Sequence, residues 1–299
     1  ETINIAFQSF VGYGPFYLAR EKGFLKDEGI ELIFIDEPLD SKRIDAFKQG
    51  MLDCEAGTID LLIEKRAQDI PVVGVLDLDH SVGSDGIVST TDIQKVEDLI
   101  GKRIAFTRND VGETFLSYLF HKKGLSLDNI IIIPENNDKA WKALAEGKAD
   151  AVVTWEPWLS KAVQTSGTHI LISTKDEPHI IVDILNVRED IVRDNPELIK
   201  KLMRGWFKAV GYYNEHPLES SKIIAKFYGI SSEEYRNQIK GLKWVSYEEQ
   251  HNAKYIEHRF EVFKIISEIK FSNGRISKKP NKKKSINTTL LETLYEYSE

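Results

Sequence analysis

The fold is decided by residues 1–36, which read ETINIAFQSFVGYGPFYLAREKGFLKDEGIELIFID. Residues 3–7 and 31–36 are short, almost continuous apolar runs, which are typical of strands covered on both faces. Between them, residues 15–26 have helical spacing, and Pro15 suits the first turn of a helix. Strand, helix and strand in this order predict a βαβ unit with parallel strands.

The same alternation continues to about residue 190. Together the runs predict an α/β protein with mostly parallel sheets. The predicted strands are 3–7, 31–36, 53–56, 71–77, 86–89, 103–107, 129–133, 151–154, 169–172 and 181–187, and the predicted helices between them are 15–26, 41–49, 58–67, 112–123 and 138–146.

The last third of the chain has a different pattern. Four helical blocks follow Arg188, and we expect no strand among them, so these helices must pack on a sheet formed earlier. Residues 278–284 contain five lysines and are predicted to be a solvated linker. Leu290, Leu291 and Leu294 then predict a short helix that docks on the body.

Length and composition narrow the class of protein. A chain of 299 residues is long enough for two domains, and its net charge of −7 argues against nucleic-acid binding. The single cysteine, Cys54, excludes a disulfide framework and cysteine-based metal sites, and we expect it to be buried. No apolar run is long enough to span a bilayer, and the strand that starts directly after Glu1 is typical of a processed or trimmed N-terminus.

Polar and aromatic residues gather where predicted strands end and helices begin. The most distinctive run is TWEPW (154–158), in which two tryptophans flank Glu156 and could enclose a cationic nitrogen. The alternative is that Trp158 packs in the core and Glu156 only complements a helix dipole. Gly12 and Gly112 lie near helix starts that could hold an anionic group, although Asp110 could instead be a simple cap.

Catalytic and metal-binding patterns are missing from the sequence. Asp77, Asp79 and His80 carry metal-ligand side chains, but no second cluster at a suitable spacing completes a coordination shell. The sequence has no Walker loop, no Gly-x-Ser-x-Gly and no cysteine–histidine arrangement. We therefore predict no metal, no cofactor and no enzyme activity.

The chain contains four motifs in register, at residues 11–25, 83–88, 153–158 and 181–185, and a helical run from Asn195 to Ala209 follows them. Together they resemble the substrate-binding proteins of the alkanesulfonate/taurine/nitrate family of ABC transporters. The resemblance implies a two-lobed type II periplasmic-binding-protein fold with a ligand cleft between two mostly parallel sheets. It also implies that lobe 1 consists of residues 1–86 and 187–277, that lobe 2 consists of residues 87–186, and that residues 278–299 form the linker and final helix.

This fold places the candidate ligand-binding residues around one cleft. Since carboxylates outnumber cations in these loops, where Arg108 is the only basic residue, we expect a zwitterionic or cationic amine such as taurine. Asp85 and Asp183 could instead brace the hinge strands. The candidate residues are Gln8, Tyr13, Thr58, Asp60, Asp79, His80, Asp85, Thr107, Glu113, Trp155, Glu156, Trp158 and Asp183.

The resemblance also implies partners and a location. We expect a monomer outside the cytoplasm, either periplasmic or lipid-tethered to the membrane, that hands its solute to an ABC permease and ATPase. A sensor domain of a receptor kinase is an alternative with the same fold. A thiamine-pyrimidine synthase is another, but that subfamily carries a cysteine-rich motif that a chain with one cysteine cannot supply.

Overall fold

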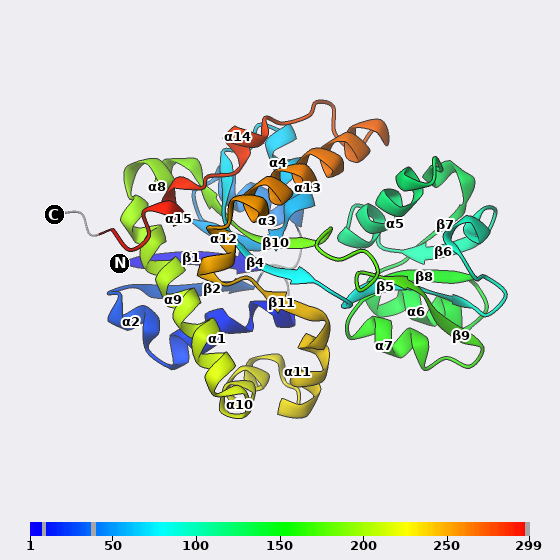
Figure 1. Cartoon of the computed structure of the whole chain (residues 1–299), viewed down its shortest axis with the longest axis horizontal. Coiled ribbons are helices and arrows are strands. Elements are labelled where there is room, and N and C mark those ends of the chain that lie inside the picture. The colour runs from blue at the N-terminus through cyan, green and yellow to red at the C-terminus, as the bar shows by residue number, and fades with distance from the viewer. Residues whose placement is uncertain (8–9, 37–39, 297–299) are drawn as a thin grey trace.

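The computed structural model describes residues 1–7, 10–36 and 40–296. The chain forms two lobes, each built on its own sheet with helices around it (Figure 1). The first lobe contains a six-stranded sheet in the order β11 (Leu242–Trp244), β4 (Val72–Ser81), β10 (Val182–Arg188), β3 (Cys54–Thr58), β1 (Thr2–Phe7) and β2 (Glu31–Asp36).

The second lobe contains a five-stranded sheet. All ten predicted strands are present in the two sheets, and the α/β class is confirmed. The order in the second sheet is β7 (Ile131–Pro134), β6 (Arg103–Phe106), β8 (Ala151–Trp155), β5 (Asp85–Thr90) and β9 (Thr168–Ser173).

Strand directions are mixed in both sheets rather than mostly parallel. Strands β1, β2 and β3 pair in parallel, as the βαβ pattern predicts, and so do β6, β7 and β8. Strands β5 and β10 run antiparallel to their neighbours because each follows a passage of the chain between the lobes. All of β10 belongs to the first sheet, so the chain returns to the first lobe before residue 182 rather than after residue 186, where the resemblance places the boundary.

Helices follow the predicted alternation closely. In the first lobe they are α1 (Gly14–Glu21), α2 (Phe24–Asp27), α3 (Asp40–Lys48) and α4 (Ile59–Ala67), and in the second lobe α5 (Val111–Lys122), α6 (Asn137–Ala145) and α7 (Trp158–Val163). The C-terminal third adds α8 (Glu189–Asp194), α9 (Pro196–Glu215), α10 (Pro217–Tyr228), α11 (Ser232–Gln238), α12 (Tyr247–Gln250), α13 (Ala253–Ser272), α14 (Lys282–Ser285) and α15 (Thr289–Glu292).

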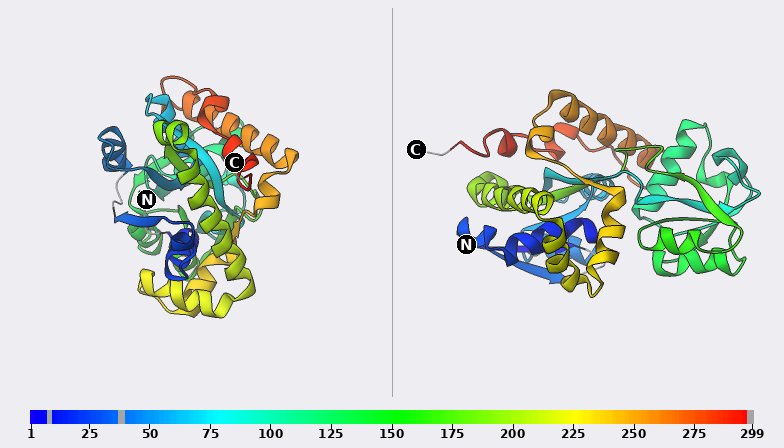
Figure 2. Two further views of the ribbon diagram at one scale, coloured as in Figure 1. Left: turned by 90° about the vertical axis from the view of Figure 1, so that its left-hand side faces the viewer. Right: turned by 60° about the horizontal axis from the view of Figure 1, so that its bottom comes forward.

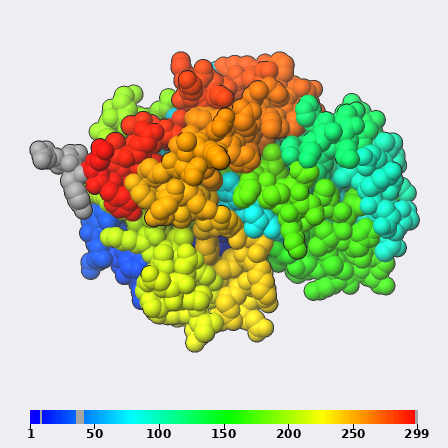
Figure 3. All heavy atoms as spheres, in the orientation of Figure 1, coloured from blue at the N-terminus to red at the C-terminus, as the bar shows by residue number. Residues whose placement is uncertain are grey.

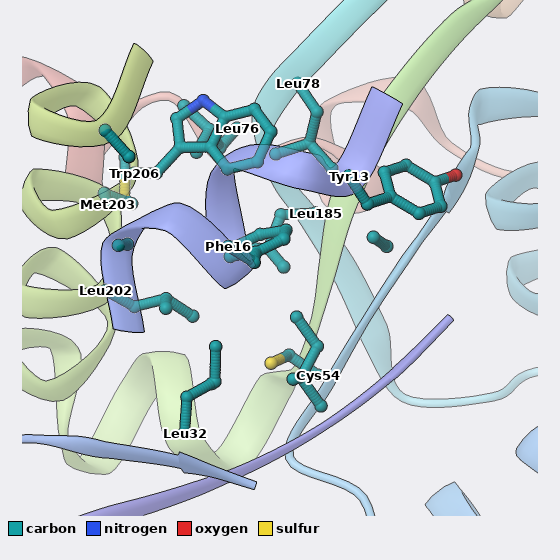
Figure 4. Close-up of a cluster of buried hydrophobic side chains, with 14 of the residues drawn as sticks. Tyr13, Phe16, Leu32, Cys54, Leu76, Leu78, Leu185, Leu202, Met203 and Trp206 are labelled. Carbon is teal, nitrogen blue, oxygen red and sulfur yellow. The ribbon is translucent and has the colours of Figure 1, made fainter. Parts of the chain in front are cut away.

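The C-terminal helices complete the core of the first lobe, as the sequence predicts. Asn195 caps α9 through Leu198 N, and the apolar face of α9 packs on α1. Trp206 and Phe16 lie at the centre, with ring centroids 4.5 Å apart, and Cys54 is buried nearby (Figure 4). This packing buries a large aromatic surface, which is the dominant favourable contribution to folding.

The expectation that this third contains no strand is wrong. Residues 242–244 form β11, which pairs antiparallel with the end of β4. Helix α13 then runs from the first lobe to α5 of the second, so it spans both lobes on one side (Figures 1 and 2). Among the described residues, no helix is both long and apolar enough to cross a membrane.

The segment after α13 combines exposed lysines with buried anchors. Lys278, Lys279, Lys283 and Lys284 are exposed, and Lys278 forms an ion pair with Asp69. Asn287 N donates to Gly74 O at 2.9 Å, which fixes the chain against β4. The predicted terminal helix is present as α15, with its buried side chains at Leu290, Leu291 and nearby Leu294.

Candidate functional site

One row of side chains crosses the first sheet next to the second lobe. The strand register places Trp244 opposite Asp79, Asp79 opposite Asp183, and Asp183 opposite Thr58. Residues directly opposite one another on neighbouring strands point to the same face of a sheet. The sequence therefore brings two carboxylates side by side on one face, from strands that are about 100 residues apart in the chain.

Asp79 is the most unusual residue of this row. Its side chain is fully buried, and neither carboxylate oxygen has a hydrogen-bond partner. Burial raises the pKa of Asp79 well above its ordinary value, and the nearby carboxylates of Asp183 and Asp85 raise it further. An isolated buried carboxylate is costly, so a group that supplies positive charge or hydrogen-bond donors would stabilise it.

Asp183 and Asp85 complete a cluster of three buried aspartates. Burial is the main cause that raises the pKa of each to about 7. The Tyr13 hydroxyl donates to Asp183 Oδ1, which opposes the shift of Asp183, and Ser81 does the same for Asp85. Among the described residues, no ion pair joins Asp79, Asp85 or Asp183 to a basic side chain. We call these three residues the aspartate cluster.

The loop in front of the aspartate cluster is fixed by aromatic side chains from the C-terminal third. Tyr228 donates to Phe10 O at 2.7 Å, and Trp244 Nε1 donates to Gly12 O at 2.7 Å. A Cβ atom on Gly12 would lie 2.5 Å from Asp79 Oδ2, so only glycine allows this close approach. The Gly12-Tyr13-Gly14-Pro15 turn thus covers Asp79 and delivers the Tyr13 hydroxyl to Asp183.

The second lobe contributes Trp155 to the same place. Asp85 and Trp155 are directly opposite each other on β5 and β8, and the rings of Trp155 and Phe10 meet edge to face at 5.8 Å. This ring contact joins the lobes. Trp155 Nε1 is buried without a hydrogen-bond partner, and its N–H dipole lowers the otherwise raised pKa of Asp110.

The hinge itself lies beside the aspartate cluster. Residues 82–84 lead from β4 to β5, and Thr174 begins the returning segment. Thr174 Oγ1 lies 2.6 Å from Ser81 Oγ and accepts from Gly83 N at 2.8 Å, so the two crossing segments are tied together. Ser84 is buried, and its hydroxyl has no partner. Because the aspartate cluster lies next to these crossing segments, binding of a solute there would affect the angle between the lobes.

A groove opens between the lobes. It has a volume of about 430 Å³ and is lined by the start of α7 and by α11, and Figure 3 shows the surface hollowed between these parts. Glu156 lies on its wall and accepts from Ser160 N at 3.2 Å, which caps α7. Trp158 is half-buried, and the Lys161 ammonium group lies over its ring. The contact between the rings of Trp155 and Phe10 does not involve Trp158.

Other candidates lie on the α13 side of the molecule. Lys270 contacts Asp60 at 3.1 Å, and Arg275 forms an ion pair with Glu113. Thr114, on α5, donates to Asp60 at 2.8 Å. The expectation that Arg108 is the only cation near these loops is therefore wrong, because two basic residues arrive from the distant end of α13. Asp60 and Glu113 hold the lobes together on this side.

The remaining candidates make their hydrogen bonds outside the aspartate cluster, although Thr58 lies directly opposite Asp183. His80 faces the opposite side of β4 from Asp79, where its Nε2 lies 2.6 Å from the Tyr255 hydroxyl and burial lowers its pKa to about 4. Thr107 donates to Glu135 O at 3.1 Å, and Thr58 donates to Asp60. Gln8 lies outside the described residues.

Carboxylates of the chain itself occupy the helix start near Gly112 that could have held an anion. Asp110 accepts from Val111 N at 2.8 Å, and Glu113 accepts from Asn109 N at 2.9 Å. These carboxylates already satisfy backbone donors at the start of α5, so they compete with an anion for that helix end. Within the described part of the chain, no group of three or more His, Cys, Asp or Glu side chains is arranged to hold a metal ion.

Three residues of the site were not among the sequence candidates. Phe10 and Ser84 lie in loops, and the only local sequence feature that marks them is that each lies next to a glycine-containing motif. Trp244 lies in Leu242-Lys243-Trp244-Val245, a short β-type run that alternates apolar and polar residues and could have been noticed.

Known proteins match this chain over most of its length. It is 24% identical over 246 residues to a protein named as a binding protein in Brucella abortus, which covers 78% of this chain and 73% of the relative. It is 23% identical over 242 residues to one named as an aliphatic sulfonates-binding protein in Bacillus subtilis, which covers 76% and 70%. A third relative is 4-amino-5-hydroxymethyl-2-methylpyrimidine phosphate synthase of Candida albicans, 23% identical over 69% of this chain and 65% of the relative.

Solved structures confirm the predicted fold. The periplasmic aliphatic sulphonate binding protein SsuA of Escherichia coli superposes with a TM-score of 0.81 at 17% identity, over 96% of this chain and 92% of that one. The alkanesulfonate-binding protein SsuA of Xanthomonas axonopodis pv. citri, bound to MOPS, gives 0.76 at 16% identity, over 96% and 98%. The two-lobed periplasmic-binding-protein fold is therefore correct.

The family follows from a match that covers both lobes. The model of the family described as NMT1/THI5 like matches residues 12–220, which include strands β2 to β10, the whole second lobe and the hinge. This range also contains Asp79, Asp85, Asp183 and Trp155. The chain therefore belongs to the NMT1/THI5-like family.

Proposed function

We propose that this protein is an extracytoplasmic solute-binding protein that captures a small amine-bearing solute between its lobes and delivers it to an ABC importer. The observation that carries the solute class is Asp79, a fully buried carboxylate without a hydrogen-bond partner, next to two further buried aspartates. A positive group would satisfy all three. A purely anionic solute would add repulsion in a place where charges are poorly screened.

The architecture supports capture by closure. The aspartate cluster lies at the hinge, and Phe10 and Trp155 meet across the lobes. The groove beside α7 opens between the two lobes. Closure of a hinge around a ligand removes it from water and strengthens its ion pairs. The relatives named as binding proteins support this function, and a monomeric state and a location outside the cytoplasm belong to the same proposal.

The sulfonates named for several relatives fit this proposal when the sulfonate also carries an amine. An aminosulfonate such as taurine carries an ammonium group for the aspartate cluster and a sulfonate that could remain nearer the groove. The bound MOPS of the Xanthomonas protein likewise combines an amine nitrogen with a sulfonate. A sulfonate without an amine offers nothing to Asp79.

A thermal-shift panel tests the solute class. It compares taurine, ethanolamine, choline and agmatine with nitrate and ethanesulfonate. A ligand present at about 100 times its Kd stabilises a protein by about 2.7 kcal/mol, which raises the melting temperature by several degrees. We expect such a shift from at least one amine and none from the plain anions. Shifts from the anions alone would contradict the amine-bearing class.

A pair of tryptophan variants tests the location. Trp155→Ala removes the ring that meets Phe10 across the lobes, so we expect it to weaken the best ligand at least 10-fold. Trp141→Ala is the matched control, because Trp141 is half-buried on α6 within the second lobe, away from the hinge. Equal affinities for the two variants would show that the solute binds elsewhere.

A further inference from the structure

The hydrogen-bond requirements of the aspartate cluster narrow the solute further than its charge does, and this inference rests on the proposed function. Asp79 offers two carboxylate oxygens, both buried and both without a donor. Asp183 uses Oδ1 to accept from Tyr13, which leaves Oδ2. The two residues are direct cross-strand neighbours, so their three available oxygens belong to one small region.

Nearby protein groups do not supply the missing donors. Tyr13 has a single hydroxyl proton, which goes to Asp183, and the indole N–H of Trp244 goes to Gly12 O. Thr58 donates to Asp60, and the two unpartnered donors near the hinge, Trp155 Nε1 and Ser84 Oγ, make no hydrogen bond to Asp79. None of these groups pairs with Asp79, so a solute that brings its own donors would satisfy this carboxylate.

A primary ammonium matches this demand in number and charge. It has three N–H donors that diverge from one centre, so a single group can bond to both oxygens of Asp79 and to Asp183 Oδ2. A guanidinium also supplies several N–H donors and can bind a carboxylate through two of them. A quaternary ammonium carries the same charge but has no N–H, and it would leave all three oxygens unpaired.

The two kinds of cation are thus separated by hydrogen bonding rather than by charge. Aromatic rings attract both of them, and Phe10 and Trp155 lie at this place. Buried carboxylates without donors, however, penalise the methylated form strongly, because an unmade bond to a buried charged group costs more than a made one gains. We propose that the cationic group of the solute is a primary ammonium or another N–H-rich cation, held jointly by Asp79 and Asp183, and that fully methylated ammonium groups are rejected.

Matched pairs of solutes test this inference. Each pair joins a primary amine to its N-trimethyl form: ethanolamine with choline, glycine with glycine betaine, and taurine with N,N,N-trimethyltaurine, while agmatine stands for guanidinium compounds. Affinities are measured by isothermal titration calorimetry on the full chain. In the pair that binds, we expect the trimethyl form to be at least 100-fold weaker. A trimethyl form that binds as tightly as its primary amine overturns the inference.

The outcomes separate this inference from the proposed function. Tight binding of a trimethyl form leaves an amine-bearing solute in place and overturns only the requirement for N–H donors. Binding of ethanesulfonate alone overturns both. Asp183→Asn adds a second readout: it keeps an acceptor oxygen for Tyr13 but removes a charge, so discrimination within the pair should fall at least 10-fold. The matched control Asp138→Asn, at an exposed position on α6, should leave discrimination unchanged.

Discussion

Asp79→Asn is expected to weaken solute binding by about 100-fold or more. The asparagine has nearly the same size, so the change removes one charge and replaces one acceptor oxygen with a donor. The solute's cation would then lose its main partner in a buried place, where truncating one member of a charged pair costs about 2–5 kcal/mol. Titration calorimetry of wild type, Asp79→Asn and the exposed control Asp138→Asn measures the difference.

The same substitution should stabilise the protein without solute at alkaline pH. The pKa of Asp79 in the folded chain is raised by burial and by its neighbours, so the folded chain holds a proton that the unfolded chain releases. Such a group contributes stability below its unfolded pKa, and that stability is lost as the pH rises through the folded pKa. Asparagine cannot ionise, and Asp79→Asn therefore avoids this loss.

Thermal unfolding at two pH values checks this sign. At pH 8 the melting temperature of solute-free Asp79→Asn should exceed that of wild type, and at pH 4 the two should be nearly equal. Asp138→Asn should differ from wild type at neither pH. A melting temperature for Asp79→Asn below wild type at pH 8 would show that the Asp79 carboxylate is satisfied in the folded chain.

Asp77→Ala is expected to lower the free energy of unfolding by about 3–5 kcal/mol. Asp77 Oδ1 accepts from Arg259 Nη1 at 3.0 Å, and Tyr255 donates to Oδ2 at 2.7 Å. Both members of the ion pair are almost fully buried, with exposed fractions of 0% and 2%. Loss of the carboxylate would leave the Arg259 guanidinium charged and buried without a partner, and would detach α13 from β4.

Urea denaturation measures this effect against an exposed pair. Asp194→Ala is the matched control, because Asp194 and Arg193 form an ion pair with exposed fractions of 62% and 70%, and such pairs contribute about 1 kcal/mol or less. The double variant Asp77→Leu/Arg259→Met should recover much of the loss, since it buries no charge. An Asp77→Ala variant as stable as Asp194→Ala would show that Arg259 finds another partner.

Local patterns in the sequence predict the elements well. Strands β1, β2 and β8 are short apolar runs, and Pro196 after Asn195 marks the start of α9. These signals depend on neighbours a few residues away. The topology did not follow from them, because whether β10 runs with or against β3 depends on where the chain returns from the second lobe.

The site is harder to predict because its partners are distant in the chain. Asp79, Asp85 and Asp183 were candidates because each lies at a strand end, and the register does bring them together. Nothing local distinguishes them from Asp60 or Glu113, which Lys270 and Arg275 reach from more than 160 residues away. The sequence shows only that carboxylates lie near the ends of the strands. The structure shows which of them pair with a basic side chain of the protein and, among the described residues, which do not.

Proton exchange on binding shows whether the cation of the solute lies on the aspartate cluster. Burial raises the pKa of Asp85 and Asp183 to about 7, and that of Asp79 is raised as well, so near pH 7 the solute-free cluster holds protons. A cation that binds there favours the ionised carboxylates and must displace protons. Titration calorimetry at pH 7 in two buffers with different ionisation enthalpies counts them. We expect net proton release on binding of the amine found in the panel, and proton uptake or no exchange would contradict a cation held by the aspartate cluster.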